Sequence, residues 1–205
     1  MAPDRDVTRG PHLDEVVAAI RGHDPDVDRD DGGWSAATAL VLADLGGGMA
    51  DVLFIERASR TGDRWSGQMA LPGGKREAGD PDLEATAIRE TAEEVGVVLP
   101  PAIGRLDDLR DRGGRRGRVA TTVHVVEGRP PTIPEPGEVE SVVWIGLTHL
   151  FHPESSTRYW HGPIGPFAGI RYGSHTVWGL TLGTLRNLAA VVGHDLPRPR
   201  GPLLG

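Results

Sequence analysis

Three glutamates, Glu90, Glu93 and Glu94, have the spacing of neighbours on one face of a helix. Their carboxylates repel one another there, which destabilises the helix unless a cation lies among them. Arg89 is one residue before Glu90 and four before Glu93, so it can pair with a carboxylate and orient it. Because the ligands are oxygen atoms only, the cluster suits a hard divalent ion, Mg²⁺ or Mn²⁺, and such ions often also contact substrate phosphates.

A glycine pair precedes these glutamates and strengthens the metal-site interpretation. Gly73 and Gly74 can bring the backbone close to a ligand or adopt positive φ. Lys75, the only lysine of the sequence, follows them directly. A solvated acidic helix face is the alternative interpretation of the glutamates, but it gives no reason for a glycine pair and a lone lysine here. We therefore expect the backbone of this segment to approach a ligand.

The glutamates need a helix to position them, and the flanking residues predict one over residues 80–95. Asp80 can cap its N-terminus, and Pro81 suits the first helical position, where no backbone donor is needed. Gly96 is the expected left-handed end of the helix. The apolar residues that we expect on its buried face are Leu83, Ala87, Ile88, Thr91 and Val95.

The segment from Gly74 to Val97 resembles the Nudix box. The family pattern is Gly, five residues, Glu, seven residues, Arg-Glu, an apolar residue, any residue, Glu-Glu, any residue, Gly and an apolar residue. In this chain Asp80 stands at the first acidic position, eight residues separate it from Arg89, and Thr91 replaces an apolar residue. The matching residues are Gly74, Arg89, Glu90, Glu93, Glu94, Gly96 and Val97.

The residues before the box resemble the coenzyme A diphosphatase branch of the Nudix family. In that branch a strand ends in arginine, and a polar loop leads to Gly-Gln-apolar-Ala-aromatic-Pro-Gly-Gly. Leu71 stands where the branch usually has Phe, and residues 106–108 and 177–181 also echo the branch. The residues that fit the outline are Arg57, Ser59, Gly67, Gln68, Ala70 and Pro72. The substrate-binding residues that the resemblance implies are Arg57, Gln68, Gly73, Gly74 and Lys75.

The resemblance implies hydrolysis of a diphosphate with Mg²⁺ or Mn²⁺ as cofactor. Glu90 and Glu94 are then metal ligands, Glu93 is a ligand or the base, and the carbonyl of Gly74 is a further candidate ligand. Coenzyme A or acyl-coenzyme A, split to phosphopantetheine and adenosine 3′,5′-bisphosphate, is the favoured substrate. The alternatives are ADP-ribose, a sugar nucleotide, a dinucleoside polyphosphate or an oxidised nucleotide. A non-catalytic Nudix-like nucleotide-binding module is a third interpretation.

Composition narrows the class of protein. The length of 205 residues suits one domain, and the absence of cysteine excludes disulfides and thiolate metal sites. A net charge of −7 argues against nucleic acid as the main partner. The first ten residues lack the apolar stretch of a secretory signal, and no run approaches the about eighteen apolar residues of a membrane span. We therefore expect a cytoplasmic protein without a membrane contact, and the family resemblance allows a homodimer.

The resemblance implies an α/β/α sandwich with a mixed central sheet. We expect the domain at residues 34–193, with an N-terminal helix (11–21) and polar linker before it and a loose tail at 194–205. His124 is expected to be structural. The arginine-rich loop 110–118 is either solvated or a phosphate grip, and Glu138 or Glu140 is a possible fourth metal or base group. The expected strands are 34–43, 52–56, 102–106, 119–127 and 139–147, followed by a hairpin at 156–172 and a helix at 177–192.

Overall fold

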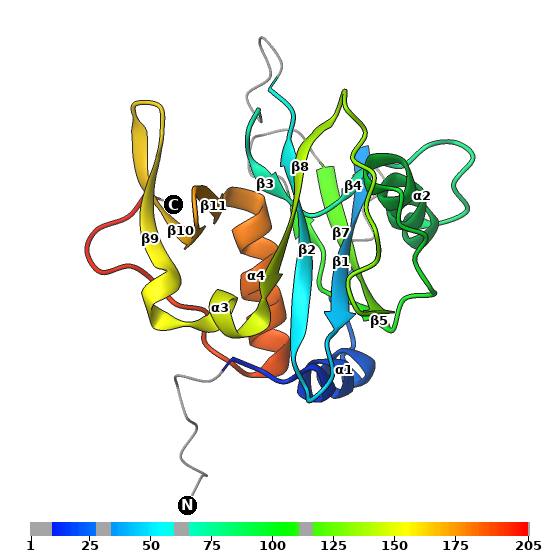
Figure 1. The fold of residues 1–205 in the computed structure, drawn as a ribbon, viewed down its shortest axis with the longest axis horizontal. Helices are drawn as coiled ribbons and strands as arrows, with labels where there is room; N and C mark the ends of the chain where they lie inside the picture. Colours follow the sequence, from blue (N-terminus) through cyan, green and yellow to red (C-terminus); the bar gives the residue numbers. More distant parts are fainter. Residues whose placement is uncertain (1–9, 28–33, 60–65, 111–116, 205) are drawn as a thin grey trace, which may run out of the picture.

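The central feature of the fold is a mixed β-sheet of eight strands in the described part of the chain (Figure 1). The structure is a computed structural model that describes residues 10–27, 34–59, 66–110 and 117–204. The strands are β1 Trp34–Asp44, β2 Ala50–Arg57, β3 Met69–Ala70, β4 Gly73–Lys75, β5 Gly104–Arg105, β6 Leu109–Arg110, β7 Gly117–Glu127 and β8 Val139–Gly146. Their order is β3-β2-β1-β7-β5, while β4 pairs with β1, β6 with β7 and β8 with β2. Among these described strands, only β1 and β7 are parallel neighbours.

A three-stranded antiparallel sheet, in the order β11-β10-β9, lies beside the central sheet (Figure 1). Its strands are β9 Ser156–His161, β10 Ile164–Tyr172 and β11 His175–Trp178. The helices are α1 Leu13–Gly22, α2 Leu83–Val95, α3 Leu147–Phe151 and α4 Gly179–Val192, with a short 3-10 turn at Pro153–Ser155. The hairpin expected at residues 156–172 is confirmed, and its turn contains Gly162 at a φ of 56°.

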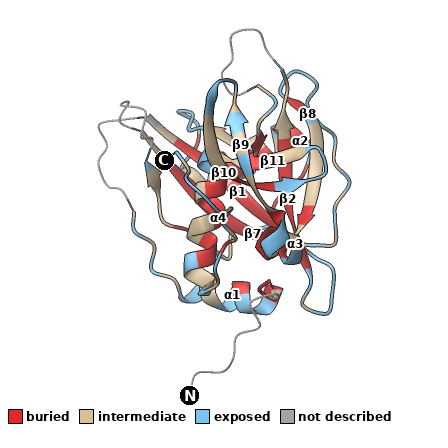
Figure 2. Ribbon diagram, turned by 90° about the vertical axis from the view of Figure 1, so that its left-hand side faces the viewer, coloured by how far each residue is buried: buried red, intermediate tan, exposed pale blue. Residues whose placement is uncertain are grey.

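Both faces of β1 are buried. Successive side chains of a strand point to opposite sides, so neighbouring residues of β1 enter two different cores. Leu40 and Leu42 pack with α1 and α4 on one face. Ala39 and Val41 pack with Ala87 of α2 on the other. Figure 2 shows buried residues along β1, β2 and β7. The expected sandwich of helices around a mixed sheet is therefore confirmed.

The chain differs from expectation at its C-terminal end. Val177 pairs with Ile170 as part of β11, so the terminal helix begins at Gly179, two residues after the expected start. The tail beyond α4 also packs on the domain instead of being loose. Leu196 is buried, and the backbone N–H of Leu204 donates to the carbonyl of Pro166 at 2.7 Å. The expectation of a loose tail took no account of these apolar residues.

His124 is fully buried in β7. Its Nδ1 lies 2.8 Å from the carbonyl of Pro100, which can only accept, so Nδ1 carries the proton. Nε2 then accepts from the hydroxyl of Thr122 at 2.9 Å. Burial lowers the pKa of His124, against the opposing effects of the Pro100 carbonyl and the charge of Glu84. These contacts fit the structural role expected from the sequence.

The lowered pKa of His124 predicts a loss of stability in acid. The unfolded chain takes up the proton near pH 6.5 while the folded protein does not, so stability falls as the pH drops through the folded pKa. One such group changes the free energy of unfolding by at most about 1.4 kcal/mol per pH unit. We expect the free energy of unfolding, measured by urea titration between pH 7.5 and 5, to change less steeply with pH for His124→Gln than for the wild type. Equal slopes for the two proteins would contradict this prediction.

Candidate functional site

Helix α2 begins two residues later than the sequence predicted. Asp82, not Asp80, is its N-cap, and its side chain accepts from the backbone N–H of Ala85 at 2.8 Å. Gly96 ends the helix at a φ of 71°, as expected. The prediction for Asp80 was wrong because Asp82 is an equally good cap two residues later and takes this position. Asp80 instead accepts from the hydroxyl of Thr86 at 3.0 Å and from Arg89.

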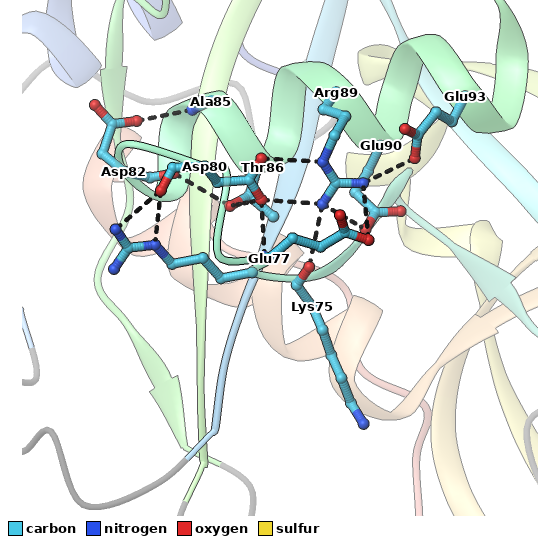
Figure 3. A network of polar contacts seen from close by, with 10 residues as sticks. Lys75, Glu77, Asp80, Asp82, Ala85, Thr86, Arg89, Glu90 and Glu93 are labelled. Carbon is cyan, nitrogen blue, oxygen red and sulfur yellow. Dashed lines mark hydrogen bonds and ion pairs between the residues drawn. The ribbon is translucent and has the colours of Figure 1, made fainter.

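Arg89 is the centre of a polar network (Figure 3). Its guanidinium donates to Glu93 at 2.8 Å and to Glu90 at 3.1 Å, which confirms the expected pairing. It also donates to both carboxylate oxygens of Asp80 at 3.0 Å and to the carbonyl of Lys75 at 3.2 Å. The hydrogen bonds from Arg89 hold the pKa of Asp80 well below its usual range. One side chain therefore ties the turn before α2 to the carboxylates on the helix.

Glu94 is buried beneath the glycine pair, with 3% of the residue exposed. The backbone N–H of Gly73 donates to its Oε2 at 2.8 Å. Burial raises the pKa of Glu94 to about 7; the Gly73 hydrogen bond and the Arg57 charge act against this rise, whereas the charges of Glu90 and Glu138 add to it. A side chain on Gly73, whose φ is 151°, would overlap the backbone of β1. Only glycine therefore lets the backbone reach Glu94.

Glu90 lies against Gly74, with 15% of its side chain exposed. A Cβ on Gly74 would overlap the Glu90 carboxyl group, so this glycine makes room for the acid. Burial raises the pKa of Glu90 against the lowering effect of Arg89, and the charges of Glu93 and Glu138 raise it further. Glu90 and Glu94 thus lie side by side under the glycine segment. Glu93 is turned toward Arg89, and 58% of its side chain is exposed.

Glu138 lies close enough to Glu90 and Glu94 for its charge to raise the pKa of each. The backbone brings it there: the N–H of Ala58 donates to the Glu138 carbonyl at 2.8 Å, and the N–H of Glu135 donates to the Glu94 carbonyl at 2.9 Å. The sequence left Glu138 and Glu140 as equal possibilities. Both precede or enter a strand and both are exposed, so no local signal separates them.

The substrate-binding residues expected from the sequence are only partly brought together. Arg57 is near Glu94, since its charge lowers the pKa of that group. The backbone N–H of Arg57 donates to the backbone carbonyl of Gln68 at 3.0 Å. The Lys75 side chain is exposed and points away from the network, to which only its carbonyl contributes (Figure 3). The arginine-rich loop lies mostly outside the described residues, at 111–116.

The oxygen donors of this site suit a hard cation, but they are not yet arranged as a complete set of metal ligands. Within residues 10–27, 34–59, 66–110 and 117–204, no three acidic or histidine side chains are close enough to hold an ion as they stand. The carboxylates of Glu90 and Glu94 nevertheless have raised pKa values, and the charge of Glu90 adds to the rise at Glu94. Two repelling oxygen donors are the groups that a divalent cation stabilises in ionised form. The residues present therefore fit such an ion.

The model of the NUDIX domain matches residues 34–165. The chain belongs to the Nudix family. The matched segment contains β1, α2 and the polar network around Arg89. Nudix hydrolases are pyrophosphohydrolases that act on small-molecule nucleotide substrates and generally use divalent metal ions, and this chain is an enzyme of that class. Among the described residues no helix is both long enough and apolar enough to span a membrane.

Two similar Nudix proteins are the mitochondrial coenzyme A diphosphatases NUDT8 of Mus musculus and Homo sapiens. Each is 34% identical to this chain over 160 residues. The alignment with the mouse protein covers 72% of this chain and 73% of the relative. For the human protein the shares are 71% and 65%, so the chain spans slightly less than two thirds of that relative. A MutT/nudix protein of Enterococcus faecalis shares the fold, with a TM-score of 0.50 and 18% identity over 80% of this chain and 57% of that one.

Proposed function

We propose that this Nudix hydrolase is a divalent-metal-dependent diphosphatase of coenzyme A or acyl-coenzyme A. The single observation that carries the substrate is the 34% identity to two proteins named coenzyme A diphosphatases, over more than 70% of this chain. The sequence resemblance upstream of the box, at Arg57 and Gln68, supports the same substrate. Water is added across the phosphoanhydride, and the products are phosphopantetheine and adenosine 3′,5′-bisphosphate.

In this proposal Glu90 and Glu94 hold Mg²⁺ or Mn²⁺ together with the carbonyl of Gly74. When bound there, such an ion would neutralise phosphate charge and lower the pKa of a nearby water. Arg89 is a positioning residue, because its hydrogen bond fixes the Glu90 carboxylate at 3.1 Å. Arg57, whose positive charge lies near Glu94, is suited to contact a substrate phosphate.

The base is one of two further acids. Glu93 is a metal ligand or base by the family resemblance, yet it is paired to Arg89 at 2.8 Å. Glu138 has the advantage that its charge raises the pKa of both Glu90 and Glu94, so this acid lies near the proposed ligands. We therefore assign Glu138 as the group that receives the proton or completes the metal site, and we leave Glu93 as the second possibility.

A small substrate panel tests the proposed function. The full chain with Mg²⁺ or Mn²⁺ is incubated with coenzyme A, acetyl-coenzyme A, ADP-ribose, a dinucleoside polyphosphate and an oxidised nucleotide, and the products are identified by mass spectrometry. We expect coenzyme A or its acetyl form to give the highest kcat/KM. If only the other nucleotides are hydrolysed, coenzyme A is rejected as the substrate. Binding without turnover of any compound would favour a binding module.

The proposed role of Glu138 predicts that its substitution lowers kcat more than the substitution of Glu140 does. Glu138→Gln removes a charge that acts on Glu90 and Glu94, and we expect kcat to fall by about 10- to 100-fold. Glu140→Gln is the matched control, because Glu140 is an exposed carboxylate two residues along the chain and is not among the main causes of either pKa shift. Steady-state rates on the best panel substrate measure the difference. Equal rates for the two variants would remove Glu138 from the site.

A further inference from the structure

A cavity of about 630 Å³ lies outside the proposed active site and is rich in arginine. Four arginines line it, from β9, β10 and the C-terminal tail, together with one exposed indole. None of its lining residues belongs to the Nudix site. Figure 1 shows β9, β10 and the tail on one side of α4 and the central sheet, with α2 on the other side. The lining residues used below are Arg158, Trp160, Arg171, Arg198 and Arg200.

The positive charge of this cavity is not neutralised by the described part of the chain. Among those residues, no ion pair joins the four lining arginines to an acid. Glu154 and Asp195 belong to neighbouring segments, but neither lines the cavity. Burial lowers the pKa of Arg186 in α4, and the nearby charge of Arg198 lowers it further. Such a cationic site is unexpected in a chain of net charge −7.

The fold holds part of this cluster in place. Arg158 lies over the Trp160 ring, 5.6 Å from its centroid, and also donates to the carbonyl of Pro202 at 3.2 Å. Arg171 donates to the hydroxyl of Thr157 at 2.9 Å. The tail is fixed beside the hairpin by the bond between Leu204 and Pro166. Arg198 and Arg200 are exposed on this fixed tail, so their guanidinium groups face solvent beside the other two.

We propose that this cavity binds a small organic phosphate, such as a nucleotide, at a site separate from catalysis. Guanidinium groups bind phosphate oxygens through paired hydrogen bonds, and several unneutralised ones converge here. Trp160 is 52% exposed and offers apolar surface to the organic part of the ligand. The volume is within the range of small-molecule sites, about 300–1,000 Å³.

Titration calorimetry on the full chain tests the site in EDTA at low salt, with inorganic phosphate and AMP as probes. We expect AMP to bind one site per chain and more tightly than phosphate. Arg198→Gln/Arg200→Gln should weaken AMP binding at least about tenfold, because two phosphate donors are lost. Trp160→Ala should reduce the preference for AMP over phosphate. Arg21→Gln, an exposed arginine at the end of α1, is the charge control and should bind as the wild type does.

Glu94→Gln separates this cavity from the proposed active site. AMP binding that persists in Glu94→Gln and is lost in Arg198→Gln/Arg200→Gln supports the proposal. Binding that survives the double arginine substitution, or that Arg21→Gln weakens equally, overturns it. Absence of AMP and phosphate binding at millimolar concentration also overturns it. None of these outcomes depends on turnover, so failure here leaves the proposed coenzyme A hydrolysis to its own test.

Discussion

Glu94→Gln is expected to reduce metal-dependent kcat by about three orders of magnitude. The substitution removes the charge of a proposed ligand, and the loss of several kcal/mol of transition-state stabilisation corresponds to such a factor. The amide oxygen of glutamine can still accept the Gly73 hydrogen bond, so the local backbone is retained. Steady-state kinetics on the best panel substrate, with Mn²⁺ affinity measured by titration calorimetry, checks both the rate and the metal site.

The fold of Glu94→Gln should be intact, which distinguishes a site effect from unfolding. The folded pKa of Glu94 is raised to about 7, so its contribution to stability is present below pH 4.5 and is lost as the pH rises through 7. At pH 8 the metal-free variant should therefore be at least as stable as the wild type. Glu84→Gln on the same helix, where Glu84 accepts from the N–H of Ala102 at 2.8 Å, is the matched control. An unchanged kcat in Glu94→Gln would reject the assignment.

Arg89→Gln should lower both activity and stability. It leaves the buried Asp80 without its main cationic partner and frees the Glu90 and Glu93 carboxylates. We expect kcat to fall on the order of 100-fold, as for groups that orient metal ligands, and Tm to fall by several degrees. Thermal unfolding and steady-state kinetics are the measurements. Arg89→Lys should recover only part of the activity, because an ammonium lacks the planar fork that serves several carboxylates together.

The neighbouring arginine provides the control for this experiment. Arg76 also binds the turn before α2, but its guanidinium donates to the carbonyls of Asp80 at 3.0 Å and Pro81 at 2.8 Å rather than to carboxylates. Arg76→Gln should therefore weaken the turn while leaving kcat near the wild-type value. A larger loss of kcat in Arg76→Gln than in Arg89→Gln would show that the turn, and not the orientation of Glu90, matters for catalysis.

The sequence predicted the helix that carries the glutamates because its signals are local. Apolar spacing, the charge pattern and Gly96 all act within one helix, and the structure agrees with them. The start of the helix was misplaced because Asp80 and Asp82 are both good caps. Hydrogen bonds from the side chains of Arg89 and Thr86 engage Asp80, which leaves Asp82 as the cap.

The parts of the site that depend on distant segments were not predictable in the same way. Lys75 follows the glycine pair in sequence, but the direction of its side chain is set by the pairing of β4 with β1. Glu138 approaches Glu90 and Glu94 only because the loop before β8 is bound to Ala58. The strand at Val177 was assigned to a helix because its pairing partner, Ile170, lies in β10. Each of these features is fixed by a contact that short-range patterns do not contain.

The pairing of the glycine segment with β1 has a consequence for dynamics. Gly73 and Gly74 lie opposite Thr38 and Ala37 in the antiparallel pair of β4 with β1, the strand whose faces contribute to both cores. Opening this segment therefore disturbs the most protected part of the molecule. The amide of Gly73, which donates to the buried Glu94 carboxylate beneath this segment, should exchange with deuterium about as slowly as core amides of β1, through near-global opening rather than loop fraying.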